Sequence, residues 1–306
     1  MKHIFIINQN AGKKSRAALL DSISEACAKE NADFEIYYTD RPRAAEDFVR
    51  ERSTDGGEYR FYACGGDGTL SEVANGAFGF ENAEVAVIPS GTGNDFIRNF
   101  SPREFFGDIA RQIRGKAHRF DLLKINDRYA VNTVNIGFDC SVVSLLEKMR
   151  GKTFLKPFRT YTFSAFLKMI PMPKFLLRFA DGKDTATRRF TLCAIGNGRY
   201  CGGGYKSNPK ALLDDGKFDV FEANDKIGRL LFLRIIGKYK KGTILDEPKL
   251  EKYVSYNVTD SLTLSADAPF EYCADGEVLK AKELSVSVCK KALRFIIPDG
   301  ASLISL

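Results

Sequence analysis

Histidine is scarce in this sequence, and its cysteines form no recognisable pairs. The 306 residues include two histidines, His3 and His118, which disfavours a metal site built on histidine. The seven cysteines are odd in number, and none belongs to a CxxC pair. This pattern argues against a disulfide framework or a structural zinc site and fits a reducing cytosol. We therefore expect a cytoplasmic protein.

Long apolar runs are also missing. No window approaches the length of about 18 uninterrupted apolar residues, so we expect no transmembrane helix. The opening stretch MKHIFIINQN has a short apolar run that leads directly into polar residues, which is not the pattern of a signal peptide. We expect any contact with a membrane to be peripheral.

The overall composition is that of a globular protein with a small basic excess. Hydrophobic residues make up 44% and charged residues 28%, and the length is typical of two domains. The chain has 46 Lys and Arg against 39 Asp and Glu, a net charge of +7. Such a balance is compatible with an anionic partner such as nucleotide, phospholipid or nucleic acid, and selects none of them.

Residues 1–122 alternate short apolar strands with amphipathic helices. Repeated β-α units predict a mostly parallel, doubly wound sheet, which binds its ligands at the carboxyl ends of the strands. The expected strands are 4–7, 34–38, 60–64 and 85–88, and the expected helices are 16–29, 43–53, 70–78 and 104–114.

Residues 123–295 are richer in strand signals and predict a β-sandwich domain with a few attached helices. The tail, residues 296–306, is a candidate to pack back on the first domain. The expected strands are 120–125 and 128–136, which form a hairpin, and 175–180, 188–195, 217–223, 253–259, 261–265 and 284–297; the helical signals lie at 141–149, 160–170 and 226–240.

Three glycine-bearing loops follow predicted strands of the first domain. They are Asn8–Lys14, Gly65–Thr69 and Ser90–Phe96. Glycine at a strand-to-helix junction lets backbone amides approach a phosphate, and the helix N-terminus favours an anion. Neither a Walker A motif nor the GxGxxG fingerprint is present. Because Asp67 stands among the glycines and would repel a bare phosphate, we expect a bridging Mg²⁺ or a proton-accepting role there.

These motifs resemble those of the diacylglycerol kinase catalytic-domain family, which includes soluble bacterial lipid kinases, sphingosine kinases and ceramide kinases. The similarity covers GGDGTLSEVANG at 65–76 and PSGTGNDF at 89–96 with Arg98. It extends to NPKALLDDGKF at 208–218, to Asp-Gly-Glu at 275–277 and to Ile-Pro-Asp-Gly at 297–300. Gln9 stands where the family commonly has proline. The resemblance runs from residue 4 to about 300 and is specific for the family rather than for one lipid.

The resemblance implies a kinase with a NAD-kinase- or phosphofructokinase-like first domain and an active site in a cleft between the domains. ATP and Mg²⁺ are the implied cofactors. By the same resemblance a structural Mg²⁺ would be held by Leu212, Asp215 and Lys217, with Leu and Lys acting through backbone carbonyls. The residues implied to contact the nucleotide are Asn8, Asn10, Ala11, Gly12, Thr39, Gly65, Gly66, Asp67, Gly68, Thr69, Glu72, Ser90, Gly91, Thr92, Asn94 and Asp95.

Phosphoryl transfer to a lipid hydroxyl needs positioning, charge neutralisation and a carboxylate that accepts the proton. The candidates are Asp67, Asp275 and Glu277, and the family itself is divided between the glycine-loop aspartate and the late acidic motif. We assign Glu277 as the base and place Asp275 and Asp67 in the Mg²⁺–phosphate network. The alternative for Asp275-Gly276 is a plain hairpin turn, and the alternative for Asp214-Asp215-Gly216 is a solvated turn.

Two basic stretches of the second domain are candidate surfaces for an anionic partner. Residues 145–178 carry eight Lys or Arg, one acidic residue and six aromatic residues. This mixture suits a peripheral contact with an anionic membrane, and it would also suit a core-facing aromatic stripe or nucleic acid. The stretch 226–241 has six basic residues and no acidic one. We expect its apolar residues Leu230, Leu231, Leu233, Ile235 and Ile236 to pack on the sandwich.

The sequence thus predicts an ATP- and Mg²⁺-dependent lipid kinase that phosphorylates a lipid alcohol such as diacylglycerol. An NAD kinase shares the GGDGT loop, but the SGTGNDF loop and the continuation LSEV speak against it. A catalytically silent nucleotide-binding regulator is the other alternative. We expect no nucleic-acid partner, and the sequence leaves a homodimer open.

Overall fold

The structure of the chain is a computed structural model that describes residues 1–8, 16–91, 93–149, 175–180 and 185–305. These residues form two compact units. Unit 1 comprises Met1–Leu122 and Cys289–Leu306, and unit 2 comprises Leu123–Val288. The sequence-based division placed 289–295 with the second domain, whereas here they belong to unit 1. The expected helix at 160–170 lies outside the described residues.

Unit 1 is built on a parallel sheet in the order β2-β1-β3-β4-β14. Its central strands β3 and β4 are almost entirely buried and mostly apolar, as both faces of such a sheet are covered. The strands are β1 (Lys2–Asn8), β2 (Phe34–Thr39), β3 (Tyr59–Gly65), β4 (Ala83–Pro89) and the second half of β14 (Glu277–Ile297).

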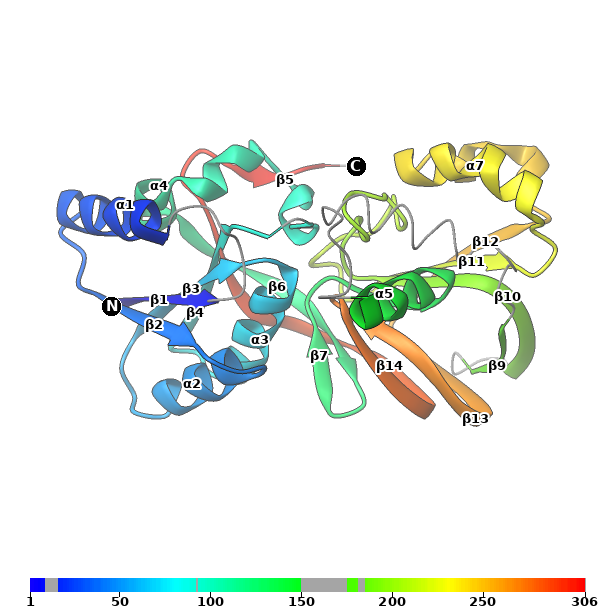
Figure 1. The fold of residues 1–306 in the computed structure, drawn as a ribbon, viewed down its shortest axis with the longest axis horizontal. Coiled ribbons are helices and arrows are strands. Elements are labelled where there is room, and N and C mark those ends of the chain that lie inside the picture. The colour runs from blue at the N-terminus through cyan, green and yellow to red at the C-terminus, as the bar shows by residue number, and fades with distance from the viewer. Residues whose placement is uncertain (9–15, 92, 150–174, 181–184, 306) are drawn as a thin grey trace. The chain divides into compact units, whose positions relative to one another are not determined.

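Helices cover both faces of this sheet, which confirms the doubly wound architecture (Figure 1). Alternate strand residues face opposite sides, so Phe5 and Ile7 pack with Ile23 of one helix layer. On the other face, Gly76 of α3 lies against Val49 of α2 so closely that a Cβ would meet the Glu46 carbonyl oxygen at 2.6 Å. The helices are α1 (Arg16–Lys29), α2 (Ala44–Ser53), α3 (Asp67–Ala77) and α4 (Ile109–Arg114).

The expected helix 104–114 is interrupted. A short 3₁₀ helix, η2 (Arg103–Gly107), precedes α4, and Asp108 between them caps α4 by accepting the backbone N–H of Arg111 at 3.1 Å. An aspartate at this position competes for the backbone and begins a new helix. A further 3₁₀ helix, η1 (Phe96–Asn99), leads into β5 (Phe100–Ser101).

The C-terminal segment completes unit 1. Phe295 of β14 pairs with Val85 of β4 and packs among four other phenylalanines. The tail strand β15 (Ser302–Leu303) pairs with β5. The backbone N–H of Asp299 donates to the Arg111 carbonyl oxygen of α4, and the Arg111 guanidinium donates to the Asp299 carbonyl oxygen. Burial of this aromatic cluster accounts for the assignment of 289–306 to unit 1; its members are Phe96, Phe100, Phe106, Phe120 and Phe295.

Unit 2 is an antiparallel β structure in the order β12-β11-β10-β8-β13-β14. β9 pairs with the first half of β10 and with β13, and β6 pairs with β7 and β14. The strands are β6 (Lys116–Ile125, which begins in unit 1), β7 (Arg128–Ala130), β8 (Thr133–Gly137), β9 (Phe175–Ala180), β10 (Thr185–Gly196), β11 (Phe218–Asn224), β12 (Val254–Thr259), β13 (Ser261–Ala274) and the first half of β14.

The two faces of the unit 2 strands build two separate apolar clusters. Cys193 and Ile195 of β10 face the strand-lined core, whereas Leu192 and Ala194 face the helices. The helices are α5 (Phe138–Met149) and α7 (Arg229–Lys241), followed by the 3₁₀ turns η3 (Ile244–Asp246) and η4 (Pro248–Leu250). None of the helices that the structure describes combines the length and apolarity needed to cross a membrane.

The prediction of a single strand over 128–136 was wrong, because this segment forms two strands, β7 and β8. β7 ends at Ala130 after pairing with β6, and β8 begins at Thr133 and pairs with β10 and β13. Between them, the backbone amides of Val131 and Asn132 are bonded to the carboxylate of Asp275 instead of to a neighbouring strand. A side chain therefore breaks the strand.

A buried histidine makes unit 1 sensitive to acid. Nδ1 of His3 shares a 2.7 Å hydrogen bond with the Tyr62 hydroxyl. Burial, and next the nearby Arg60 guanidinium, lower the pKa of His3 to about 4. Arg60 is itself buried and paired with Glu84 at 2.8 Å. His3 is therefore neutral in the folded protein at physiological pH.

We expect the free energy of unfolding to fall as the pH drops from about 6.5 to about 4, because there the unfolded chain binds a proton that folded His3 does not. The contribution has a slope of up to about 1.4 kcal/mol per pH unit. Denaturant unfolding across this range should show that His3→Gln reduces the slope by this contribution, whereas the exposed His118→Gln leaves it unchanged. An unchanged slope in His3→Gln would contradict this account.

Candidate functional site

The carboxyl ends of the parallel strands of unit 1 bring the predicted nucleotide residues to one edge of the sheet. Asn8 at the end of β1 is in register with Thr39 at the end of β2, and Gly65 is in register with Pro89. Thr39 is buried, and Asn8 Nδ2 donates a 3.2 Å hydrogen bond to Thr69 Oγ1. Asn10, Ala11, Gly12 and Thr92 were assigned to the same site, but they lie outside the described residues.

The loop after β3 turns at once into α3. Gly66 precedes the helix, and Asp67, Gly68 and Thr69 form its first turn. A Cβ on Gly65 would lie 2.2 Å from Thr69 Oγ1, so the turn requires glycine there. The first backbone N–H groups of a helix have no intrahelical partner and are suited to an anion.

Asp67 ties this loop to the loop after β4. Its Oδ1 accepts the backbone N–H of Asp95 at 2.8 Å and that of Phe96 at 3.2 Å. Asp95 in turn accepts Arg98 Nε at 3.0 Å, and Arg98 also donates to the Gly93 carbonyl oxygen. The aspartate among the glycines therefore fixes one loop against the other.

The two loops also touch through their backbones. A Cβ on Gly91 would lie 2.5 Å from Gly66 Cα, and the backbone N–H groups of Ser90 and Gly91 both donate to the Gly65 carbonyl oxygen. Asn94 adopts a φ of 49° and donates Nδ2 to the Gly91 carbonyl oxygen. Its Oδ1 is buried and has no hydrogen-bond partner among the described residues, so it remains open to a donor.

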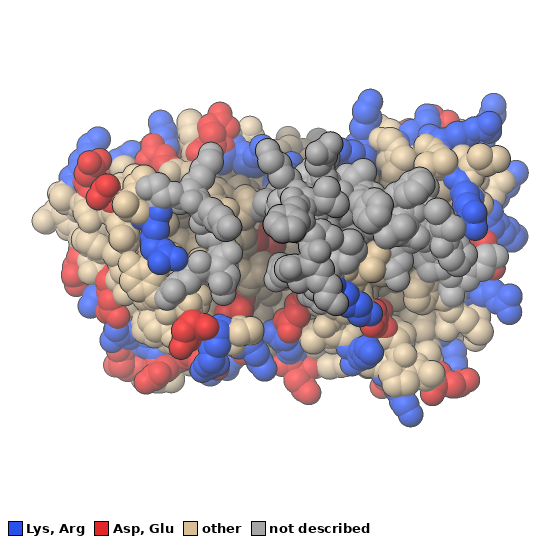
Figure 2. All heavy atoms as spheres, viewed as in Figure 1, with Lys and Arg blue, Asp and Glu red and all other residues tan. Residues whose placement is uncertain are grey.

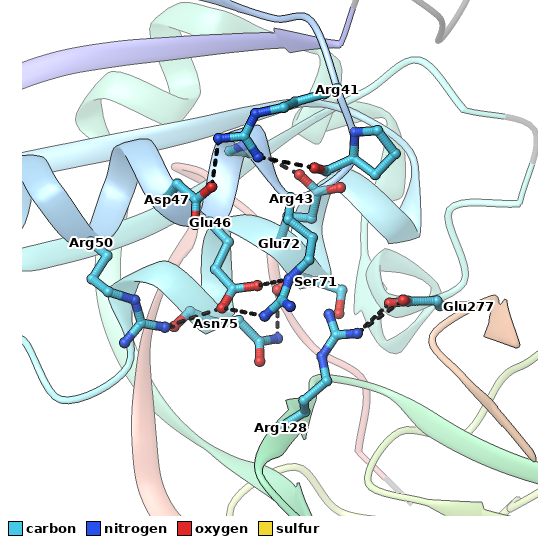
Figure 3. Close-up of polar contacts among 12 residues, drawn as sticks. Arg41, Arg43, Glu46, Asp47, Arg50, Ser71, Glu72, Asn75, Arg128 and Glu277 are labelled. Atoms are coloured by element: carbon cyan, nitrogen blue, oxygen red, sulfur yellow. Dashed lines mark hydrogen bonds and ion pairs between the residues drawn. The ribbon is translucent and has the colours of Figure 1, made fainter. Parts of the chain in front are cut away.

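Glu72 of α3, which was also assigned to the nucleotide, has a structural contact. Its Oε2 accepts the backbone N–H of Ala45 at 3.3 Å and so binds the first turn of α2. Figure 3 shows Glu72 beside the ion pairs that α2 makes, in which Glu46 pairs with Arg43 and Arg50. Glu72 therefore sets the position of α2 beside α3.

In unit 2, Asp275 acts as an acceptor for backbone amides. Asp275 and Gly276 have φ values of 46° and 94° and form the two-residue turn between β13 and β14. The Asp275 carboxylate accepts the N–H groups of Val131 at 2.6 Å, Asn132 at 3.0 Å and Thr133 at 3.0 Å. This is the hairpin-turn alternative, with both carboxylate oxygens engaged. A role in a Mg²⁺–phosphate network stays a prediction.

Glu277 lies two residues further on and is held differently. Both its carboxylate oxygens accept Arg128 Nη1, at 2.9 and 2.8 Å (Figure 3). The Glu277 side chain is 51% exposed, against 24% for Arg128. Arg128 therefore orients a carboxylate that is open to solvent, so that a substrate hydroxyl could come within hydrogen-bond reach of it.

The residues assigned to a structural Mg²⁺ lie before β11. Asp215 is exposed and its Oδ1 accepts the backbone N–H of Lys217 at 3.0 Å. Asp219, four residues after Asp215, is buried, and its Oδ1 has no partner among the described residues. No group of three His, Cys, Asp or Glu side chains gathers as a metal cluster in the described ranges.

The orphaned Asp219 oxygen fits a nearby cation. Burial raises the pKa of Asp219 to about 6, and the charge of Asp215 acts in the same direction. A Mg²⁺ ion here would draw on Asp215, on the backbone carbonyls of Leu212 and Lys217 and on water, all of which are oxygen ligands.

Sequence reasoning missed Asp139 in the first turn of α5. Its Oδ2 accepts the Tyr239 hydroxyl at 3.2 Å and lies 3.9 Å from Cys201 Sγ. Burial raises the pKa of Asp139 to about 6. The available signal was Gly137 before it, whose φ of 93° and close approach to the Thr191 carbonyl oxygen require glycine at this strand-to-helix junction.

These features define a class of protein, in which a doubly wound α/β domain with paired glycine loops is joined to an NAD-kinase-like β-sandwich. The family model described as "Diacylglycerol kinase catalytic domain" matches residues 2–125. The model described as "YegS C-terminal NAD kinase beta sandwich-like domain" matches residues 132–297. The chain belongs to the family that combines these two domains, and the resemblance inferred from its motifs is confirmed.

Curated relatives and solved structures agree with this assignment. Over 266 residues the chain is 25% identical to a protein of Alcanivorax borkumensis named "Probable lipid kinase YegS-like", covering 85% of each chain. It is 29% identical over 274 residues to a protein of the same name from Pseudomonas aeruginosa, covering 84% of this chain and 82% of the other. A diacylglycerol kinase structure from Bacillus anthracis has the same fold, with a TM-score of 0.72, 22% identity and 96% coverage of both chains.

The contact between the glycine loops predicts opposite effects of two alanine substitutions. Gly91→Ala would place a methyl group against Gly66 and should lower the free energy of unfolding by about 1–3 kcal/mol. The matched control is Gly68→Ala in the first turn of α3, where an added methyl group would contact nothing. Because alanine favours a helix, this substitution should raise the free energy of unfolding by up to about 1 kcal/mol. Denaturant unfolding followed by circular dichroism measures both, and equal effects would rule out the close loop contact.

The bonds of Asp275 predict that it stabilises unit 2. Asp275→Ala leaves three backbone N–H groups without their acceptor and should lower the free energy of unfolding by about 3 kcal/mol or more. Asp127→Ala, in the exposed turn between β6 and β7, is the matched control and should change it by less than about 0.5 kcal/mol. If Asp275→Ala unfolds like the unmodified protein, the carboxylate does not hold the 131–133 loop.

Proposed function

We propose that this protein is a lipid kinase that transfers the γ-phosphoryl group of ATP, with Mg²⁺, to the hydroxyl of a lipid alcohol such as diacylglycerol. The names of its relatives support a lipid kinase. The observation that carries the proposal is the pair of glycine loops that Asp67 holds together at the carboxyl edge of the unit 1 sheet.

This edge is suited to a triphosphate. It presents the first backbone amides of α3 as donors, and the buried Thr39 ends β2 at the same edge. Fixed amide donors at a helix N-terminus stabilise phosphate charge without reorganising during the reaction. Mg²⁺ bound with the nucleotide would neutralise phosphate charge, and the Asp67 carboxylate among the glycines is a fitting oxygen ligand.

The reaction itself requires an in-line alcohol and a place for its proton. The lipid oxygen forms a bond to the γ-phosphorus while the bond from that phosphorus to the β,γ-bridging oxygen breaks, and ADP leaves with the electron pair. The hydroxyl proton passes to a carboxylate. We assign this role to Glu277, because its carboxylate is exposed and held by one ion pair to Arg128, whereas Asp275 is engaged by three backbone amides.

The test is transfer of label from γ-labelled ATP, with Mg²⁺, to a panel of lipid alcohols in mixed micelles. We expect label in one lipid class. Glu277→Gln should reduce the turnover number by about 10²-fold or more, as expected for loss of a general base. Asp67→Asn should reduce turnover as well. Glu271→Gln removes another ion-paired carboxylate from the same hairpin and should leave turnover unchanged.

Other outcomes would revise the proposal in defined ways. Label in NAD, offered as a soluble acceptor, would make the protein an NAD kinase. ATP binding without transfer to any acceptor would make it a silent regulator. Full activity in Glu277→Gln would move the base to another carboxylate.

A further inference from the structure

The outer face of α7 in unit 2 is apolar as well as basic. The helix packs on the sheet through Phe232, Ile235 and Tyr239, which are buried. Leu230 and Leu233 are 74% and 55% exposed, contrary to the expectation that they pack on the sandwich. They stand one helical turn apart, so their side chains lie on the same face and form a single apolar strip on the surface.

Basic residues surround these two leucines. The segment 226–241 has six Lys or Arg and no Asp or Glu. Arg234 is one and four residues from the leucines, and Arg229 precedes them. Within the described part of the chain, no carboxylate pairs with Arg229, Arg234 or Lys241, whereas Lys238 pairs with Glu247. Figure 2 shows Lys and Arg side chains gathered at the edge of unit 2 formed by α7 in Figure 1.

Helix stability accounts for only part of this pattern. Lysines in the last turn interact favourably with the helix dipole, which explains Lys238, Lys240 and Lys241. It explains neither the arginines of the first half nor the exposure of two leucines between them. A surface that combines exposed leucine with unpaired arginine matches an anionic bilayer, where the leucines enter the acyl boundary and the arginines meet phosphate groups.

We propose that α7 docks unit 2 on an anionic lipid bilayer, with Leu230 and Leu233 inserted and Arg229, Arg234 and Lys241 on the headgroups. Nucleic acid would use the positive charge but would leave the leucines in water. The inference goes beyond phosphoryl transfer, because it assigns a binding surface that any lipid-directed activity of the chain would use. Binding needs no turnover, so it can be tested without ATP.

The sequence offers a clean reporter, because it contains no tryptophan. Leu230→Trp places a single indole on the proposed surface. Its emission should shift to shorter wavelength on addition of phosphatidylcholine vesicles containing about 30 mol % phosphatidylglycerol, and much less with phosphatidylcholine alone. Val258→Trp, at a valine of β12 that is 50% exposed and outside both basic stretches, is the matched control and should not shift.

Further substitutions in the Leu230→Trp protein separate the two contributions. Arg229→Ser and Arg234→Ser should each weaken vesicle binding about fivefold, and raised salt should weaken it too. Leu233→Ser should weaken it about tenfold or more. Lys282→Ser, at an exposed lysine of β14, is the matched control for charge and should have little effect.

The proposal fails if Leu230→Trp gives no shift with the anionic vesicles, or if Val258→Trp shifts equally. If the protein binds neutral vesicles as well as anionic ones, and the arginine substitutions do not change this, electrostatic attraction does not contribute to binding. That result would overturn the assignment to an anionic surface. A shift with duplex DNA but not with vesicles would assign the face to nucleic acid instead. Circular dichroism of each variant shows that a loss of binding is not a loss of fold.

Discussion

The site of unit 1 depends on one carboxylate that accepts two backbone amides. Asp67 Oδ1 is bonded to Asp95 and Phe96, and these two bonds fix the loop after β4 against the first turn of α3. Together with the bonds that the Ser90 and Gly91 amides donate to the Gly65 carbonyl oxygen, they hold Gly66 and Gly91 so close that a methyl group cannot fit between them. The amides of the helix N-terminus can then act as preorganised donors, which is what phosphate chemistry requires of a protein.

Unit 2 repeats the same physical solution in a different place. Asp275 accepts three backbone amides and fixes the chain between β7 and β8. The turn that it forms with Gly276 also places Glu277 as the first residue of β14. An aspartate that organises a loop and a glutamate oriented by an arginine thus lie within three residues of sequence. Because the two residues are so close, the sequence could not show that Asp275 binds backbone amides whereas Glu277 keeps an exposed carboxylate.

The sequence predicted most of the elements because their apolar periodicities were clear, and α1 and β9 have the expected bounds. The prediction failed where a side chain forms hydrogen bonds with backbone N–H groups and so ends a strand or begins a helix. Asp275 interrupts the expected strand 128–136 through a hydrogen bond from a residue far away in the sequence. Asp108 divides the expected helix 104–114 because it caps α4.

In the candidate site, the glycine loops were recognisable from the spacing of their glycines. Asp139 was not, because the partners of its carboxylate, Tyr239 and Cys201, lie far along the chain. The outward face of α7 was missed because apolar residues were assumed to be buried.

Strand β14 has a consequence for how the protein is made. Its last residues complete the sheet of unit 1 through the pairing of Phe295 with Val85, although 210 residues separate the two partners. The polypeptide therefore enters unit 2 after Leu122 and returns after Val288. On the ribosome, unit 1 cannot close its sheet or its phenylalanine cluster until the second half of β14 has emerged, so its folding must wait until all of unit 2 has been synthesised.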